Sequence, residues 1–566
     1  PQPQPSRSEQ RAIALPPLSW YNRLANSKHW MVPKEDGMID CRKVLRAMAA
    51  GCVLALVLVL VLLLMREASL VSASTTSDVR YVRTDGADVS NDCTVIASPC
   101  RTVQHALDKA NPEDEILVAT GVYTGVQVRN TMTQVVYISQ TVTLRGGYSG
   151  DFASWDPDTF PTTLDAERKG RVVSIFGAAT GATLDSFTIT GGDATGVTAE
   201  CPSSGGITDG CGGGIFVRSA HPTIVNNVVT DNVAAFSAGG HSASGGGLCV
   251  AYAYGTVITN NVVISNAASL GERGMGGGIH MYFPNNVSLI SNQVLSNTAT
   301  THSTFSGWGG GLAIGSGSSP AATIHGNRIE GNRTNGSGTG QGAGIYLWFG
   351  SADLADNLVV GNTGSEAVFL GHSQFDFESN RVVDNDTTAG VLLSHNPAPS
   401  DLKLTNNFVA RSGSRSFGVI GGSVSPLTVT LLHNTLVGSG TGSGVHVDTG
   451  HMTLNLTNNI VAHHAWGITN TLPASSSIVA DHTLFWANTH DGVEGTNPVL
   501  GDPAFVDPEG GDFHLSIGSA ARNAGIDAGV LTDVDGGARP TGLAPDIGAD
   551  EASWAQVFLP VVLRHP

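Results

Sequence analysis

Nine copies of one short pattern follow each other along the chain, and they restrict its fold more than any other feature. Each copy reads apolar, two variable positions, Asn, one variable position, apolar, as in "IVNNVVTDN" from Ile224. The first Asn of the copies falls at Asn227, Asn261, Asn292, Asn327, Asn357, Asn380, Asn407, Asn434 and Asn459, with spacings of 34, 31, 35, 30, 23, 27, 27 and 25 residues. A self-similar period of this length indicates a solenoid, in which each repeat forms one turn.

A glycine-rich pattern alternates with the Asn pattern in the first half of the repeat region. It occurs as "GCGGGIFV", "SGGGLCV", "GMGGGIHM", "GWGGGLAIG" and "GQGAGIYL". The first apolar residues after the glycines are Ile215, Leu248, Ile279, Leu312 and Ile345, which lie 33, 31, 33 and 33 residues apart. Sharp corners need positive φ angles and close backbone stacking, and both favour Gly. Each glycine run therefore predicts a corner, followed by a short strand such as the one that points Leu312 and Ile314 into the core.

The apolar positions of the repeat favour strands over helices. They form short β-branched runs, Gly and Asn are frequent inside the repeat, and no stretch of it has the spacing of an amphipathic helix. These features predict an all-β protein, a parallel β-helix whose successive turns stack about 4.8 Å apart. Stacked Asn side chains tolerate the left-handed conformation and can pass amide hydrogen bonds from turn to turn. We therefore expect the nine Asn residues to form a structural ladder.

The two patterns together resemble the right-handed parallel β-helix repeat of pectate-lyase-like proteins, and also the repeats of polymorphic outer-membrane adhesins. "PCRTVQHALDKANPEDEILVATGVY" from Pro99 resembles the opening module of the family, in which a short N-terminal helix caps the first coil. "LDSFTITGG" from Leu184 resembles an early coil with Phe187 at the Asn position. The fold is thus expected to be a right-handed solenoid, while the functions of such folds are diverse.

The C-terminal part resembles a closing module of secreted bacterial β-helix proteins. The segments that carry this resemblance are "DPAFVDPEGGDFHLSIGSAARNAG" from Asp502 and "APDIGADE" from Ala544. The resemblance implies a β-helix over residues 80–490, a closing module over 491–554 and a C-terminal tail over 555–566.

Near the N-terminus, Ala47 to Met65 form a run of 19 residues without a charge. Three basic residues precede it: Arg42, Lys43 and Arg46. This is the positive-inside pattern of a segment that enters a membrane. Val71 and Ala73 then have the spacing that a signal peptidase accepts. Residues 47–73 are therefore predicted to be a signal peptide or, if uncleaved, a membrane anchor through residues 47–65, with 1–46 as its cytoplasmic or n-region segment. Either outcome places the protein outside the cell or on its surface.

Cysteine spacing agrees with export. Cys93 and Cys100 bracket six residues, and Cys201 and Cys211 bracket nine, which suits short disulfide loops in an oxidising compartment. Cys249 is then left unpaired. Metal ligation is the alternative, but the sequence has no C-x-x-C spacing and its histidines are scattered.

Charge and residue content weigh against two classes of function. A net charge of -18 with 29 Lys plus Arg argues against a nucleic-acid partner. A lyase needs a Lys or Arg base beside several carboxylates, yet Lys403 is the single lysine after Arg171 and the carboxylates look dispersed. Asp384 and Asp386 are interpreted as turn residues, and "DVDGG" from Asp533 lacks the distal Glu of a calcium loop. We therefore expect no catalytic residue, no metal and no cofactor.

Alternate residues of the strands after the glycines should point outward, and many of them are aromatic or basic. They are Phe216, Arg218, His280, Tyr282, Tyr346 and Trp348. Sugar rings stack on aromatic side chains, so His280, Tyr282, Tyr346 and Trp348 are candidate glycan-binding residues. Their two strands lie two turns apart, about 10 Å, and a turn carrying Ala313 and Gly315 separates them. The alternative is that long loops simply cover this face.

These observations lead to one expected function and two alternatives. The expected function is that of an exported cell-surface protein for adhesion or for contact with a polysaccharide or cell-surface glycan, without catalysis. The first alternative is a polysaccharide lyase or glycoside hydrolase of the pectate-lyase-like class. The second is a passive structural spacer.

Overall fold

The computed structural model describes residues 77–552, except for short stretches at 178–179, 198–200, 202–207, 237–241, 316–321, 335–339, 395–400, 422–426 and 494. The predicted n-region (1–46), signal or anchor segment (47–73) and tail (555–566) lie outside the described residues. Among the residues that are described, no helix is long and apolar enough to cross a membrane.

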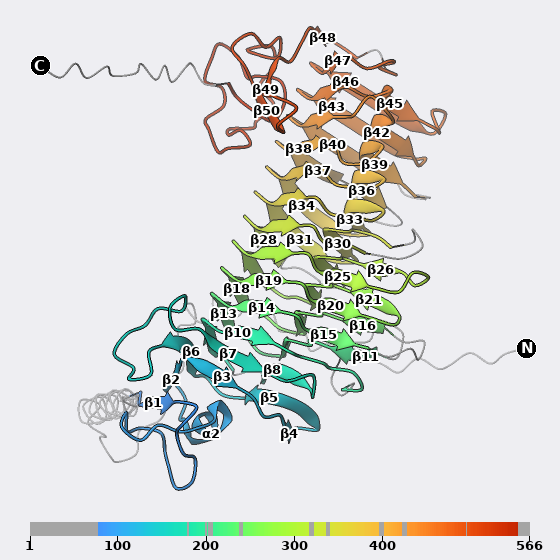
Figure 1. Cartoon of the computed structure of the whole chain (residues 1–566). Coiled ribbons are helices and arrows are strands. Elements are labelled where there is room, and N and C mark those ends of the chain that lie inside the picture. The colour runs from blue at the N-terminus through green and yellow to red at the C-terminus, as the bar shows by residue number, and fades with distance from the viewer. Residues whose placement is uncertain are drawn as a thin grey trace, which may run out of the picture. The chain divides into compact units, whose positions relative to one another are not determined.

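Strands from successive turns pair side by side into three long sheets that follow the coil (Figure 1). The first sheet contains β1 (Val79–Val82), β2 (Glu115–Ala119), β6 (Thr143–Tyr148), β9 (Thr183–Asp185), β13 (Thr223–Val225), β18 (Val257–Thr259), β23 (Ser288–Ile290), β28 (Ala322–His325), β31 (Ser351–Ala355), β34 (Gln374–Glu378), β37 (Asp401–Thr405), β40 (Leu427–Leu432), β43 (Met452–Thr457) and β46 (Ser476–Asp481). The second contains β3 (Gly121–Tyr123), β7 (Thr162–Asp165), β10 (Thr188–Thr190), β14 (Val228–Thr230), β19 (Val262–Ile264), β24 (Gln293–Leu295), β29 (Arg328–Glu330), β32 (Leu358–Val360), β35 (Arg381–Val383), β38 (Phe408–Ala410), β41 (Thr435–Val437), β44 (Ile460–Ala462), β47 (Leu484–Trp486) and β48 (Val499–Leu500).

The third sheet carries the predicted outward aromatic residues. It contains β4 (Gln127–Arg129), β5 (Met132–Ile138), β8 (Arg171–Phe176), β12 (Ile215–Arg218), β17 (Leu248–Ala251), β22 (Ile279–Tyr282), β27 (Leu312–Gly315), β30 (Ile345–Trp348), β33 (Glu366–Gly371), β36 (Ala389–Ser394), β39 (Arg415–Ile420), β42 (Ser443–Asp448) and β45 (Trp466–Asn470). All pairings in the three sheets are parallel except β4 with β5. The predicted parallel β-helix is therefore confirmed.

Two short sheets occur only in the longer turns of the coil. One contains β11 (Thr208–Cys211), β16 (Ser242–Ser244), β21 (Arg273–Met275) and β26 (Gly307–Trp308), and the other contains β15 (Val233–Ala235), β20 (Ala267–Ser269) and β25 (Thr298–Thr300). Single bridges continue both sheets into the next turn, at Arg333 and Gln341, so the extra residues of the longer repeats build an additional layer beside the third sheet.

The inward residues of all three sheets form one continuous apolar core along the coil. Leu312 and Ile314 are both fully buried in it, as the sequence predicts. The preceding glycines make the corner possible. Gly309 has φ +64°, and a Cβ added to Gly310 would lie 2.5 Å from the carbonyl oxygen of Ala343 in the next turn. Side chains at this corner would therefore separate the stacked turns.

The nine repeat asparagines lie in one buried row at the corner between the first and second sheets. Asn227 donates its backbone N–H and its Nδ2 to Oδ1 of Asn261, at 2.9 and 3.0 Å, and this pattern continues to Asn459. At the N-terminal end, the backbone N–H of Phe187 donates to Oδ1 of Asn227 at 3.0 Å. A second row begins at Asn232 and ends where Asn385 donates to Oγ of Ser412 at 3.0 Å. The two rows satisfy corner groups that the sheets do not reach.

Each end of the coil carries an additional element. At the N-terminal end, α2 (Val103–Lys109) starts at the N-cap Thr102, whose side chain accepts a hydrogen bond from the backbone N–H of His105 (Figure 1). This is the predicted capping helix. At the C-terminal end, the hairpin of β49 (Phe505–Asp507) and β50 (Asp512–Leu515) packs against the second sheet, where Phe513 lies near Phe408.

The four cysteines of the two short loops are bonded as Cys93–Cys100 and Cys201–Cys211. Cys249 is a buried free thiol, and burial raises its pKa to about 12.

Candidate functional site

Three consecutive strands of the third sheet bring the predicted glycan-binding residues together. In the register of β22, β27 and β30, His280 lies beside Ala313 and Ala313 beside Tyr346. The second outward position shows the same order, with Tyr282, Gly315 and Trp348. Small residues on the middle strand therefore lie between two strands with large rings.

A hollow of about 530 Å³ lies over the middle strand. We call it the aromatic hollow, and it is lined by Met275, His280, Tyr282, Trp308, Ala313, Ile314, Gly315, Tyr346, Trp348 and Phe349. Ala313 and Gly315 form its floor, while Met275 and Trp308 reach it from the short sheet of β21 and β26. Its volume falls within the usual range of small-molecule sites, about 300–1,000 Å³.

The outward column is less open than the sequence suggests, which corrects the expectation of exposed aromatic ridges. His280 is 4% exposed and Tyr282 is 8% exposed, while Tyr346 and Trp348 are half-buried. Phe216 is completely buried, and the guanidinium of Arg171 lies 4.5 Å from the centre of its ring. The additional layer built by the longer repeats accounts for this burial, so the rings line a hollow rather than a flat platform.

The wall formed by β30 is held by further aromatic contacts. The Tyr346 ring stacks on Phe369 of the next turn at 5.3 Å and lies nearly parallel to Trp348 at 6.2 Å. Trp348 extends over Gly371, where an added Cβ would lie 2.3 Å from the indole, and His372 packs edge-on against it at 4.3 Å. These contacts fix the orientation of the Tyr346 and Trp348 rings.

Exposed aromatic residues mark the corner that directly follows the third sheet. Tyr252, Phe283 and Phe349 have φ angles of 52°, 50° and 52°, a left-handed conformation that bulky residues rarely adopt. The Tyr252 and Phe283 rings stack at 5.5 Å, and those of Phe349 and His372 at 4.8 Å. A bulky residue in this conformation costs about 1–2 kcal/mol. Sequence reasoning missed these residues, although their position directly after the strand of the glycine pattern would have identified them.

Burial keeps His280 neutral and leaves part of it unsatisfied. Its Nδ1 is buried and has no hydrogen-bond partner among the described residues. Desolvation lowers the pKa of His280 to about 4. Desolvation also raises the pKa of the Tyr346 hydroxyl. It raises the pKa of the buried Glu366 carboxyl to about 7, and this carboxyl accepts a hydrogen bond from the backbone N–H of Gly342.

A row of charged side chains crosses the first sheet on a different face. Asp353, Asp376 and Lys403 lie side by side in register on β31, β34 and β37. Asp376 and Lys403 are exposed, and Asp353 lies 3.0 Å from Nε2 of His325. The carboxylates that look dispersed in the sequence are thus stacked. Each member lies four residues before a ladder Asn, which is the signal that would have revealed the row.

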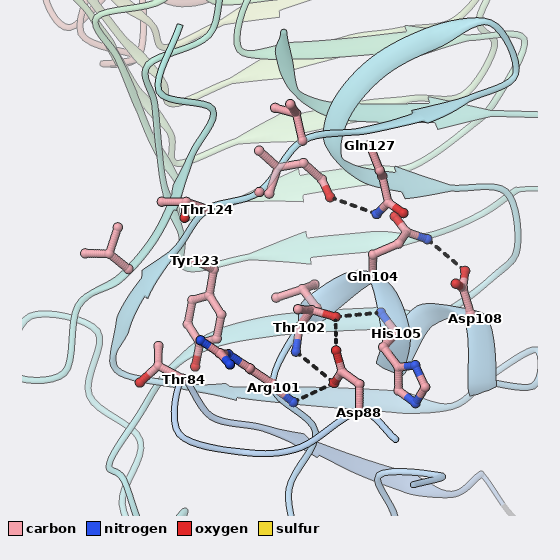
Figure 2. A pocket seen from close by; sticks show the side chains of 15 residues that line it. Thr84, Asp88, Arg101, Thr102, Gln104, His105, Asp108, Tyr123, Thr124 and Gln127 are labelled. Carbon is pink, nitrogen blue, oxygen red and sulfur yellow. Dashed lines mark hydrogen bonds between the residues drawn. The ribbon is translucent and has the colours of Figure 1, made fainter. Parts of the chain in front are cut away.

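A second hollow, of about 520 Å³, lies beside α2 at the N-terminal end (Figure 2). The polar groups that line this hollow form hydrogen bonds with one another. Asp88 accepts hydrogen bonds from the backbone N–H groups of Arg101 and Thr102 and from the Thr102 hydroxyl, and Gln104 donates to Asp108 at 3.0 Å. We interpret this hollow as part of the cap, because these bonds fix the start of the helix.

Two of the other acidic residues singled out in the sequence, Asp384 and Asp533, have structural partners, while Asp386 is exposed. Asp384 is a corner residue with φ 53° that pairs with Arg411. Asp533 accepts hydrogen bonds from the backbone N–H groups of its own turn, at Asp535 and Gly537.

One cluster of the C-terminal module has the composition of a metal site. His514, Asp535 and Asp550 bring their ligand atoms within 4.8 Å of one another. Both imidazole nitrogens are already engaged, Nδ1 by Asp512 and Nε2 by Asp535 at 2.8 Å.

This protein is a parallel β-helix, as its stacked sheets and Asn rows show, and the aromatic hollow lies on its third sheet. Residues 291–436 match the family model described as the right handed beta helix region, which confirms the predicted right-handed β-helix. The resemblance to adhesin repeats stays a prediction.

Several solved structures are similar to this chain. Pectate lyase Pel9A is 13% identical with a TM-score of 0.37, covering 85% of this chain and 97% of that one. The rhamnogalacturonan lyase structure is 12% identical with a TM-score of 0.33, covering 76% and 91%. XylC in complex with xylose is 10% identical with a TM-score of 0.39, covering 83% and 98%. Among curated proteins, no match was found.

Proposed function

We propose that this protein is exported to the cell surface and that its aromatic hollow binds a glycan without cleaving it. The observation that carries the proposal is the order of residues across β22, β27 and β30, where a floor of Ala313 and Gly315 separates His280 and Tyr282 from Tyr346 and Trp348. The C–H faces of a sugar ring are apolar and pack against aromatic rings, while its hydroxyls need polar partners at the edges of the site.

The strained aromatic residues at the corner after the third sheet, of which Phe349 lines the hollow, support a binding role over simple cover. Asn or Gly would adopt the corner conformation of Phe283 and Phe349 at lower cost, yet the chain places exposed aromatic rings there. Exposed rings contribute little to the core, so their retention in a strained conformation favours contact with a ligand.

Export is supported by two independent features. The uncharged run at Ala47 to Met65 follows a basic segment, and the chain forms two short disulfides, a bond that persists in oxidising compartments. Fractionation of cells that express the protein tests this part of the proposal. Intact protein found in the cytosol, with reduced cysteines, would remove the export claim.

Binding is tested by calorimetric titration of the purified protein with a panel of oligosaccharides. Trp348→Ala removes one wall. Gly315→Val fills the floor, where the atom of the described residues that an added Cβ meets is the Trp348 carbonyl oxygen, at 3.9 Å. Both variants should lose binding. Trp466→Ala is the matched control, because Trp466 lies on the same sheet at β45, is exposed and does not line the hollow. Binding that survives both hollow variants would show that the glycan site lies elsewhere or does not exist.

Polysaccharide cleavage is a second candidate function, favoured by the row of Asp353, Asp376 and Lys403. A β-eliminating enzyme uses a basic side chain to remove a proton beside a sugar carboxylate, with neighbouring carboxylates holding a cation. Incubation with polygalacturonate and Ca²⁺, followed by ultraviolet detection of unsaturated ends, tests this function. Turnover that disappears in Lys403→Met would establish catalysis on the first sheet and contradict a purely binding role.

A further inference from the structure

The chemistry of the aromatic hollow restricts the kind of sugar that it accepts. None of the described residues that line it carries a charge at neutral pH. Its one ionisable imidazole, His280, stays neutral because burial lowers its pKa to about 4.

A sugar carboxylate in this hollow would lose water without gaining a cation. Burying an ionised carboxylate without a partner is strongly unfavourable. No arginine is among the described residues that line the hollow: Arg273 precedes the lining residue Met275 on β21, Arg218 lies over the ring of Tyr252 at 5.2 Å, and Arg415 acts on Glu366. The nearby carboxyl of Glu366 supplies no cation, since burial raises its pKa to about 7, and the whole chain carries a charge of -18. The field at the hollow therefore opposes an anionic ligand.

His280 provides the polar contact that an uncharged sugar needs. The side chain is 96% buried, since 4% of its surface is exposed, and it lines the hollow. Its Nδ1 is buried below the surface with no partner among the described residues, so Nε2 is the nitrogen that a hydroxyl in the hollow would reach. A neutral imidazole offers one donor and one acceptor, and a hydroxyl group can satisfy either. A ligand that closes over Nε2 removes the access of this nitrogen to water, so a hydroxyl that replaces the hydrogen bond is selected over an apolar group.

We propose that the aromatic hollow is specific for an uncharged glycan, with His280 as the specificity-determining residue that hydrogen-bonds a ring hydroxyl between the stacked aromatic side chains. This inference rests on the proposed glycan-binding function and adds the class of ligand. The chain selects neutral polysaccharide over uronate polymers by excluding charge from the hollow.

Titration of the purified protein with neutral and acidic oligosaccharides of equal length tests the charge specificity. The probes are cello-oligosaccharide and manno-oligosaccharide against oligogalacturonate, measured by calorimetry. At least one neutral probe should bind about tenfold or more tightly than the acidic one. If oligogalacturonate binds as well or better and Gly315→Val abolishes its binding, the glycan function stands and the charge specificity is wrong. If no probe binds, the proposed function itself fails.

Two substitutions at His280 test its role. His280→Leu keeps the apolar packing and removes the hydrogen bond, so binding of the neutral probe should weaken about tenfold, the value of one good hydrogen bond. His280→Gln restores a donor and an acceptor and should recover part of the loss. A folded His280→Leu variant that binds as tightly as the unmodified protein would show that His280 does not contact the ligand. If His280→Leu does not fold, His280→Ala takes its place, and a folded His280→Ala variant that binds as tightly as the unmodified protein would lead to the same conclusion.

Discussion

Asn292 donates both its backbone N–H and its side-chain Nδ2 to a single oxygen, Oδ1 of Asn327, at 2.9 and 3.1 Å. The same Nδ2 also donates to the carbonyl oxygens of Ile258 and Ile290, at 2.9 and 3.0 Å. Asn292 Oδ1 in turn accepts two hydrogen bonds from Asn261. One side chain thus connects three successive turns at a corner that is closed to water.

Replacement of Asn292 by Ala should lower the free energy of unfolding by about 3 kcal/mol. The substitution leaves buried donors and acceptors of the adjacent turns unsatisfied, and each such group costs about 1–3 kcal/mol. Because turns of a solenoid contact only their neighbours, increased hydrogen exchange should be confined to the adjacent coils. Asn455→Ala is the control, since Asn455 lies on β43 outside the ladder, and its change should stay within about 0.5 kcal/mol. Equal effects of the two substitutions would contradict a structural role for the row.

The repeat pattern is sufficient to predict the coil because each turn repeats the same local requirements. Leu312 is buried and Asn227 is stacked because every turn has an equivalent residue in the same place. The burial of His280 and Tyr282 could not be predicted in this way. It depends on β21 and β26, which end at the variable residue before the glycines, Met275 or Trp308, and the pattern does not reveal that this residue folds over the third sheet.

Contacts between turns also explain what the sequence concealed at the two candidate sites. Asp376 and Lys403 are 27 residues apart in the chain but adjacent in register, and only alignment on the ladder reveals this. The strained position of Phe349 likewise follows from its place directly after the strand and not from its residue type, because the φ angle is set by the corner geometry.

Replacement of Phe349 by Asn should change stability little while it weakens glycan binding. Asn accepts the left-handed conformation, so the strain that is relieved, about 1–2 kcal/mol, offsets the lost packing of an exposed ring. We expect thermal unfolding within a few degrees of the unmodified protein and weaker retention on a polysaccharide column. Ser291→Asn is the matched control, since Ser291 has φ 56° and does not line the hollow. A large loss of stability with unchanged retention would mean that Phe349 is structural cover.

Replacement of His280 by Leu should alter the pH dependence of stability in one direction. The pKa of His280 is about 4 in the folded protein and ordinarily 6.5, so the unfolded chain takes up a proton between these values that the folded protein does not. The contribution of the neutral His280 to the free energy of unfolding is therefore fully present above pH 6.5 and is lost as the pH falls towards 4.

As the pH falls through this window, the free energy of unfolding should decrease less steeply in His280→Leu than in the unmodified protein. The two slopes should differ by up to about 1.4 kcal/mol per pH unit. His433 and His464, whose pKa values burial lowers to about 3 and about 4, contribute in the same direction in both proteins and cancel in the difference. Glu366 opposes them, because its raised pKa favours the folded state at lower pH. Denaturant titrations at pH 4.5, 5.5 and 7 measure the difference, and parallel curves would contradict a buried neutral imidazole.

Gly315 and Gly371 lie on either side of Trp348 in the same column of the third sheet, and their substitution should have opposite effects on stability. Among the described residues, an added Cβ at Gly315 meets one atom, at 3.9 Å, and a β-branched residue suits a strand, so Gly315→Val should raise the free energy of unfolding by about 0.5–1 kcal/mol. At Gly371 the added Cβ lies 2.3 Å from the indole, so Gly371→Ala should push Trp348 from its position and cost about 1–3 kcal/mol.

Both variants should nevertheless lose glycan binding, the first because the floor is filled and the second because the wall moves. Calorimetric titration together with thermal unfolding distinguishes these effects. Binding losses that simply follow the stability of each variant would indicate general disruption of the fold, whereas loss in the more stable Gly315→Val variant places the ligand over the floor of the aromatic hollow.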